Sequence, residues 1–146
     1  MVYKKCSKCG KKIEQYTECE CMVQAKKESY KRYKDRRMLD KEEKKRQEFY
    51  VSKAWLTLSN LIKNHFFGIC VLCWLRGLIV SAVYTHHIEE TDKREDLMLS
   101  EDNLLPLCAS CHKMTHGQYS KGSNAESNMK KILVDAIIKF DKEYYE

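Results

Sequence analysis

Residues 102–113 read DNLLPLCASCHK, and residues 70–73 read CVLC. Each stretch holds two cysteines separated by two residues, and two such pairs can complete a tetrahedral four-cysteine zinc site. A site with four cysteine ligands has no open position. The zinc would therefore be structural, and it would hold together the ends of the 34-residue segment between the pairs. The predicted ligands are Cys70, Cys73, Cys108 and Cys111.

Polar residues able to bind a metal lie within and beside this segment. His86, His87 and Asn103 lie between the cysteine pairs, and His112 directly follows the last cysteine. Adjacent histidines in a regular strand point to opposite faces, so both can serve one site only at a strand end or a bulge. Ordinary buried histidines are therefore an alternative interpretation. His116 lies four residues after His112 on the same helix face; we favour a surface histidine, with a third metal or phosphate contact as the alternative.

The first 21 residues hold a second group of cysteines. Residues 6–11, CSKCGK, have the form of a zinc knuckle, whereas only one residue separates the second pair. The group consists of Cys6, Cys9, Cys19 and Cys21. The N-terminus is charged throughout and has no apolar signal segment. Because paired cysteines in a reducing compartment bind metal rather than each other, we expect a cytoplasmic protein with two zinc ions.

The charge of the chain is unevenly distributed. There are 27 Lys and Arg against 21 Asp and Glu, a mild bias towards anionic partners. Eleven of the basic and six of the acidic residues lie in residues 22–48, which we expect to form a helix. A solvated helix with i,i+4 ion pairs and a basic arm lying along a phosphate backbone are both consistent with this segment.

Amphipathic helices are expected on both sides of the predicted zinc site. Residues 49–66 show helical spacing of apolar residues, with Ser52 as the N-cap. The core face would consist of Trp55, Leu58, Leu61 and Ile62. Residues 124–145 show the same periodicity, and Ser123 and Glu126 match a capping box at the start. The apolar face of this second helix would be core or an oligomer contact.

Residues 66–85 are hydrophobic enough to raise the question of a membrane span. Arg76 and Gly77 lie in the middle, and an arginine at the bilayer centre costs about 2.5–3.5 kcal/mol. Two short buried strands joined at Arg76-Gly77 explain these residues better, so we expect no membrane partner. Arg76, at the tip of that hairpin, and Lys113 are candidate phosphate contacts.

The residues from CVLC through HHI at 86–88 to the DNLLPLCASCH stretch resemble the HNH nuclease family, whose core is a ββα-metal fold. Upstream, FYVSKAW at 49–55 resembles a stretch that precedes this core in many phage-encoded members. These members often carry an N-terminal cysteine-rich knuckle and a basic helix. The resemblance implies an α+β fold, with a mostly helical chain around a zinc-clamped ββα-metal core. Its expected parts are a zinc knuckle at 1–21, basic and amphipathic helices at 22–66, the HNH core at 67–117 and a C-terminal amphipathic helix at 118–146.

The same resemblance implies a metal-dependent DNA endonuclease. His87 matches the general base, which takes a proton from the attacking water, and Asn103 matches the residue that orients it. His112 matches a ligand of the catalytic metal. His86 matches a second ligand, where many members have aspartate, and imidazole suits a transition metal such as Ni²⁺ better than Mg²⁺. The expected cofactors are two structural Zn²⁺ and one catalytic divalent ion, Mg²⁺, Mn²⁺ or Ni²⁺.

Double-stranded DNA is the partner that the resemblance implies, and a phage packaging terminase is a candidate second partner in the bacterial cytoplasm. An acidic loop, residues 89–102, departs from the glycine-rich turn of many members; it either points away from DNA or supplies a carboxylate to the metal. The alternative function is a non-catalytic zinc module that binds nucleic acid or protein. That module would keep both four-cysteine sites but would not use His86 and His112 as ligands.

Overall fold

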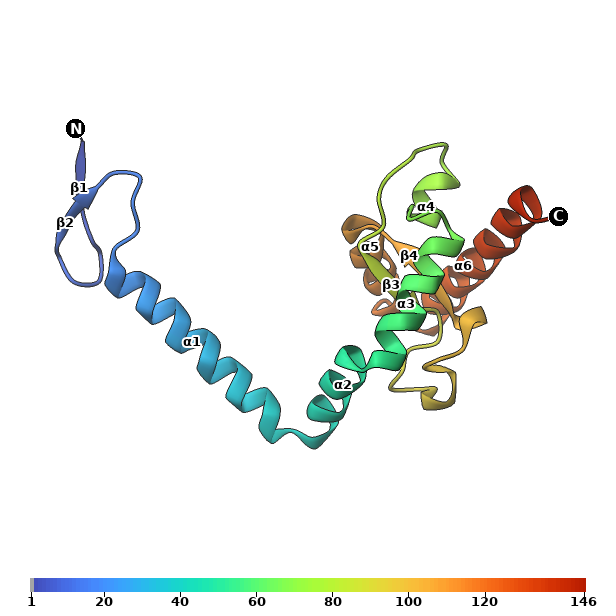
Figure 1. The fold of residues 1–146 in the computed structure, drawn as a ribbon, viewed down its shortest axis with the longest axis horizontal. Helices are drawn as coiled ribbons and strands as arrows, with labels where there is room; N and C mark the ends of the chain where they lie inside the picture. Colours follow the sequence, from blue (N-terminus) through green and yellow to red (C-terminus); the bar gives the residue numbers. More distant parts are fainter. Residues whose placement is uncertain (1) are drawn as a thin grey trace. The chain divides into compact units, whose positions relative to one another are not determined.

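The computed structural model describes residues 2–146, and the chain divides into two compact units (Figure 1). The N-terminal unit spans Met1–Tyr50 and the C-terminal unit spans Val51–Glu146. Each unit contains one of the two cysteine groups. No helix in the described part of the chain combines the length and the apolar composition that crossing a bilayer requires.

The N-terminal unit is a small hairpin followed by exposed helices. Strands β1 (Tyr3–Lys5) and β2 (Lys12–Glu14) pair antiparallel, and the loop between them is closed by a hydrogen bond from the Gly10 amide to the Cys6 carbonyl. Helices α1 (Glu20–Leu39) and α2 (Lys41–Val51) follow, and neither contains a buried residue. Their stability therefore depends little on packing within this unit.

The single helix expected over residues 22–48 is interrupted at Asp40. Asp40 has extended backbone angles, φ −81° and ψ 116°. Its carboxylate accepts hydrogen bonds from the amides of Glu42 and Glu43, at 2.9 and 3.2 Å. Asp40 is therefore the N-cap of α2, and its side chain satisfies two amides that a new helix start leaves without partners.

Helix α3 (Lys53–His65) opens the C-terminal unit and begins as expected. The Ser52 hydroxyl accepts a hydrogen bond from the Trp55 amide at 3.2 Å, which confirms the predicted N-cap. The buried stripe is Trp55, Ser59 and Ile62. The assignment of Leu61 to the core is wrong: its side chain is 56% exposed, because it lies beside this stripe and not on it.

The two buried strands expected around Arg76-Gly77 are also absent from the structure. Helix α4 (Val71–Trp74) takes the place of the first, and residues 78–80 are exposed. The Cys73 carbonyl accepts hydrogen bonds from the amides of Arg76 and Leu78, and a single bridge joins Ile69 to Ser81. Cys70 and Cys73 must point to the same side to share one metal ion. Residues three apart in a pleated strand point to opposite faces, so a tight turn replaces the strand here.

The centre of the unit is two strands followed by a helix. Strands β3 (Tyr84–His87) and β4 (Leu104–Leu107) pair antiparallel with His87 opposite Leu104, and helix α5 (Ala109–Tyr119) follows directly. Two 3₁₀ turns, Glu95–Leu97 and Glu101–Asn103, lie in the connection between the strands. This order confirms the expected ββα arrangement within an α+β fold.

Helix α6 (Ser123–Tyr144) packs on α4 and α5 and completes the core. The six largest fully buried side chains come from α3's C-cap, β4 and α6: Phe66, Leu104, Leu105, Leu107, Leu133 and Phe140. The predicted capping box is wrong. Gly122 is the N-cap, with φ 116°, and Glu126 instead binds Lys130 and Lys93 at 2.7 and 2.8 Å. This helix holds the ββα segment from one side.

Candidate functional site

The structure brings the four cysteines of the C-terminal unit into one buried cluster. Cys70 and Cys108 are the N-cap residues of α4 and α5, so each pair spans a helix start. The four sulfur atoms lie within 4.8 Å of one another, and Cys73 is 3.8 Å from Cys108 and 3.6 Å from Cys111. These distances exceed the S–S bond of about 2.0 Å, and all eight cysteines of the chain are free.

The chemistry of this cluster fits a structural zinc ion. Burial raises the pKa of the Cys73 thiol to about 11, so the thiolates that zinc requires form when the ion replaces their protons. Four thiolates around Zn²⁺ carry a net charge of about −2. The Arg76 guanidinium lies 3.9 Å from Cys111 Sγ, where its charge offsets part of that excess. Arg76, a candidate phosphate contact from sequence, thus lies against the cysteine cluster.

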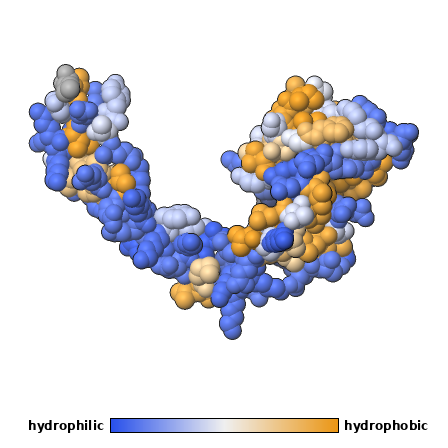
Figure 2. Space-filling view, viewed as in Figure 1, coloured by the Kyte–Doolittle hydropathy of each residue, from blue (hydrophilic) through white to orange (hydrophobic). Residues whose placement is uncertain are grey.

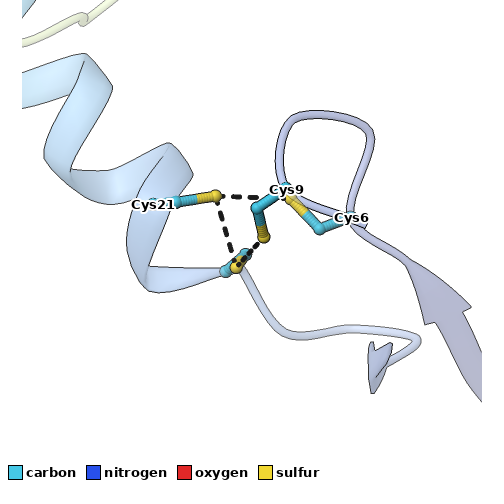
Figure 3. Close-up of side chains that lie close together, drawn as sticks. Cys6, Cys9 and Cys21 are labelled. Atoms are coloured by element: carbon cyan, nitrogen blue, oxygen red, sulfur yellow. Dashed lines mark hydrogen bonds between the residues drawn. The ribbon is translucent and has the colours of Figure 1, made fainter. Parts of the chain in front are cut away.

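The N-terminal cysteines form a second cluster (Figure 3). Sulfur–sulfur distances are 3.5 Å from Cys6 to Cys21, 3.5 Å from Cys9 to Cys19 and 3.4 Å from Cys19 to Cys21. The one-residue spacing of the second pair is explained by its place in the fold. Cys19 has the extended conformation of a helix N-cap and Cys21 lies in the first turn of α1, so the bend at the helix start directs both sulfurs inward.

A third cluster consists of His86 on β3 and His112 and His116 on α5. One ring nitrogen from each of these histidines lies within 4.8 Å of the others, and the Nε2 atoms of His112 and His116 are 3.3 Å apart. His116 is exposed, as expected, and it also lies in this cluster, which is consistent with the alternative of a third metal contact that its four-residue spacing from His112 had raised. We refer to these residues as the three-histidine cluster.

His86 is the buried member of this cluster. Its side chain is 2% exposed, and Nε2 is a buried side-chain polar atom without a hydrogen-bond partner in residues 2–146. Burial, together with the neighbouring His116 and His112 rings, lowers the pKa of His86 to about 3. The ring is therefore neutral near pH 7, and an unpaired buried nitrogen is costly unless a ligand occupies it. Three imidazole side chains form a donor set that fits a divalent transition metal.

Residues around the cluster orient its rings. The Tyr84 ring stacks on His112 with centroids 4.6 Å apart. The Glu90 carboxylate lies 3.6 Å from His116 Nδ1, which favours the proton on that nitrogen and leaves Nε2 for a ligand. The acidic loop thus contributes one carboxylate that faces a cluster histidine. Its neighbour Glu89 is paired with Lys130 at 2.8 Å.

His87 lies outside the three-histidine cluster, on the other side of β3. Its ring stacks on Trp55 of α3, with centroids 4.8 Å apart and planes 18° apart. Its Nε2 atom is 2.9 Å from the Met98 carbonyl oxygen, so Nε2–H donates this bond and Nδ1 keeps its lone pair. Burial lowers the pKa of His87, against the opposing effect of the Met98 carbonyl. The ring is therefore neutral and held in one tautomer.

Asn103 contacts the backbone around His87. Its side-chain hydrogen bonds go to this backbone and not to the His87 imidazole. Its side-chain oxygen accepts from the Glu89 amide at 2.7 Å. Its amide nitrogen donates to the carbonyls of Glu89 and Leu97, at 3.1 and 3.2 Å. These bonds fix the chain two residues after His87 and one residue before Met98. Asn103 therefore holds in place both the backbone that follows His87 and the segment that carries the Met98 carbonyl, to which the His87 ring donates.

Comparison with known proteins agrees with this geometry. The family model for HNH endonucleases matches residues 70–118, from the first cysteine of the zinc cluster to the end of α5. A crystal structure of an HNH endonuclease from the deep-sea thermophilic bacteriophage GVE2, with manganese ion, is similar to the chain. The TM-score is 0.52 at 25% sequence identity, and the match covers 56% of this chain and 96% of the phage protein. Among curated proteins, none matches the chain significantly. Residues 70–118 of this chain are therefore similar in sequence to the HNH endonuclease family, and the fold resembles that of the phage enzyme.

Proposed function

We propose that this chain is a metal-dependent endonuclease that hydrolyses phosphodiester bonds in double-stranded DNA. The observation that carries the proposal is the unpaired, buried Nε2 atom of His86 beside His112 and His116. These three residues would hold the catalytic ion. A divalent ion bound there supplies positive charge that stabilises the phosphate and the departing 3′ oxygen. A module that binds zinc only through its cysteines would not require this set of three histidine donors.

His87 is the general base in this proposal. Its Nδ1 atom takes the proton from the water that attacks phosphorus, the bond from phosphorus to the 3′ oxygen breaks, and that oxygen takes a proton from solvent. The Met98 carbonyl supports this role by keeping the His87 proton on Nε2. Because His87 is the last residue of β3, the proposal requires the phosphate to lie at this strand end, between the His87 ring and the three-histidine cluster. Asn103 is a positioning residue for this base.

The ligand set also bears on the choice of metal. Imidazole nitrogens bind Ni²⁺, Mn²⁺ and other transition ions more readily than Mg²⁺, which prefers oxygen ligands and water. We therefore propose Mn²⁺ or Ni²⁺ rather than Mg²⁺ as the better activating ion, and Zn²⁺ for the two cysteine clusters. Cytoplasmic location and association with a phage terminase remain predictions from the family resemblance, and co-purification with a terminase would test the second.

The deciding experiment incubates supercoiled plasmid with zinc-loaded protein and Mg²⁺, Mn²⁺ or Ni²⁺. The wild type is expected to give nicked or linear DNA, and His87→Ala is expected to lose this activity at unchanged zinc content. His65→Ala is the matched control, because His65 pairs with Asp141 and stacks on Tyr145, away from the cluster. Folded, zinc-loaded wild type that cuts no DNA with any of these ions would favour the non-catalytic binding module.

A further inference from the structure

The two units differ sharply in charge. Met1–Tyr50 holds 16 Lys and Arg against nine Asp and Glu, a net charge of +7. Val51–Glu146 holds 11 Lys and Arg against 12 Asp and Glu, a net charge of −1. One zinc ion with four thiolates in each unit lowers both values by about two and leaves the difference unchanged. The unit that contains the HNH domain therefore has no positive excess with which to attract a polyanion.

Five of the seven basic residues of α1 gather on one side of the helix. Lys26, Tyr30, Tyr33 and Arg37 follow one another at intervals of four, three and four residues, which places them in one row along the helix. Lys27, Lys31 and Lys34 form the adjacent row. Arg32 and Arg36 lie on the opposite side, and the two acidic residues of this stretch, Glu28 and Asp35, lie between that side and Lys31. We define the basic face of α1 as Lys26, Lys27, Lys31, Lys34 and Arg37.

Packing within the protein does not account for this sorting. Helix α1 contains no buried residue, and hydrophilic residues cover most of its length in Figure 2. Lys27, Lys31 and Lys34 form no salt bridge with any residue of the range 2–146, and α1 shows no internal i,i+4 ion pair. On α2, residues 22–48 do include one such pair, Lys44–Glu48 at 4.0 Å, so the solvated helix with ion pairs describes α2 but not α1.

Two tyrosines lie among the basic side chains. Tyr30 is 69% exposed, and Tyr33 is 48% exposed with the Arg37 guanidinium 5.3 Å above its ring. Exposed aromatic rings between lysines offer hydroxyl groups to phosphate oxygens while leaving the lysine charges free. The helix is about 30 Å long at 1.5 Å per residue, close to the 34 Å of one turn of B-DNA. The basic and tyrosine side chains of α1 and the length of the helix therefore suit contact with about one turn of DNA phosphate backbone.

We propose that the basic face of α1 binds the phosphate backbone of duplex DNA and supplies most of the electrostatic affinity of this enzyme for its substrate. The proposal rests on the proposed function, since that function makes DNA the polyanion that the chain must hold. Contacts from lysine to phosphate carry no sequence information, so this face contributes affinity and not site preference. The HNH domain then needs only the contacts that align one phosphate with His87 and the three-histidine cluster.

The test compares two doubly substituted full-length proteins that lose the same charge from the same helix. Lys27→Gln/Lys34→Gln removes two lysines of the basic face, and Arg32→Gln/Arg36→Gln removes two arginines of the opposite side. Glutamine keeps helix propensity close to that of both residues. Binding of a fluorescent 30-base-pair duplex is measured by anisotropy between 50 and 200 mM salt, with His87→Ala in every protein so that the DNA stays intact.

The expected result is a difference between the two variants in salt dependence. The plot of log affinity against log salt should lose about 0.9 of slope for each phosphate contact removed, so about 1.8 for the basic-face variant. The opposite-side variant should keep the slope of the parent. Equal changes in the two variants, or no change in either, would overturn the proposal. Circular dichroism of both variants checks that α1 remains helical.

Plasmid cleavage with His87 intact separates this proposal from the proposed function. The basic-face variant should need a higher DNA concentration for half-maximal rate, with kcat unchanged, because it loses uniform binding only. Loss of binding in that variant, with no cleavage by the wild type, would refute the nuclease and leave the DNA-binding face standing. Cleavage that is equal in both variants, with equal salt slopes, would refute the face and leave the nuclease standing.

Discussion

The Trp55 indole lies almost parallel to the His87 imidazole, with ring centroids 4.8 Å apart. Trp55 is buried in the first turns of α3, and Ser52 caps that helix through the Trp55 amide. A helix outside the ββα segment therefore supports the ring to which we assign the role of general base. The FYVSKAW stretch, which precedes the HNH core in sequence, thereby gains a physical role in addition to core packing.

Trp55→Ala should lower kcat by about 10–100-fold, because a ring free to shift by an ångström loses alignment with the water that it activates. Trp55→Phe keeps a stacking surface and should retain most of the activity. Trp74→Phe is the aromatic control, since Trp74 packs against Phe140 and Tyr144 at the other side of the unit. Urea unfolding of Trp55→Ala and Trp74→Phe distinguishes positioning from general stability. If the two variants lose activity in proportion to their loss of stability, the positioning role is refuted.

His116→Ala should weaken binding of Mn²⁺ or Ni²⁺ to the zinc-loaded protein by at least about tenfold, because it removes one of three imidazole donors. Glu90→Gln should weaken it by a similar or smaller factor, since Glu90 orients the His116 ring from outside the cluster. Isothermal titration calorimetry measures both effects. His65→Ala should bind these ions like the wild type, and a similar loss in that variant would show that the cluster is not the binding site.

Stability should fall as the pH is lowered from 7.5 to 5.5 in protein that lacks the catalytic ion. The pKa of His86 is depressed to about 3 in the folded state, against about 6.5 when unfolded, so the unfolded chain binds more protons in this window. The contribution of His86 to stability is complete above pH 6.5 and is lost as the pH falls towards 3. Each pH unit costs about 1.4 kcal/mol once the unfolded ring is protonated.

Urea midpoints at pH 7.5, 6.5 and 5.5 measure this effect. The variant His86→Gln removes the titrating ring, and its stability should depend less on pH than that of the wild type. Zinc content is followed at each pH, because protonation of the cysteine thiolates would also release the structural ions. Identical pH profiles for the two proteins at constant zinc content would contradict the assignment of the effect to His86.

Loss of a ligand should have different consequences in the two cysteine clusters. Cys111→Ser should release one zinc ion, lower the melting temperature of the C-terminal unit and abolish cleavage, because α4, β4 and α5 meet at that buried cluster. Cys9→Ser should also release one zinc ion, but the C-terminal unit should keep its melting transition and its binding of Mn²⁺. Calorimetry and zinc analysis of the two variants provide the measurement. Unfolding of the C-terminal unit in Cys9→Ser would show that the units do not fold separately.

Local spacing was sufficient to predict several features of this protein. A CxxC pair is a chelate in itself, so Cys70, Cys73, Cys108 and Cys111 could be grouped from sequence, and the structure confirms that grouping. The Ser52 cap depends on atoms three residues apart and was predicted for the same reason. Asp40 could have been recognised in the same way as the N-cap of α2, because its carboxylate accepts from the amides of Glu42 and Glu43. The prediction of one continuous helix missed this cap.

The incorrect predictions concern features that depend on which other parts of the chain pack nearby. Leu61 and the strands expected around Arg76 were predicted from apolar character and periodicity, which do not reveal which neighbours will be present. Ser123 matches a capping box, yet the N-cap lies one residue earlier, at Gly122, and Glu126 pairs with Lys130 of the same helix and with Lys93 of the loop after β3. The contact with Lys93 joins segments that are distant in the sequence.

The sequence by itself determined the two cysteine groups and marked His86, His87, Asn103 and His112 as the residues of interest, because these rest on residue type and short spacing. The ββα order was implied by the resemblance to the HNH nuclease family. Tertiary structure alone decided that His116 lies beside His86 and His112, that Trp55 stacks on His87, and that Asn103 bonds the backbone of Glu89 and Leu97. Each of these relationships joins segments separated in the chain. Side chains on different segments meet only where burial of the common core brings their strands and helices together.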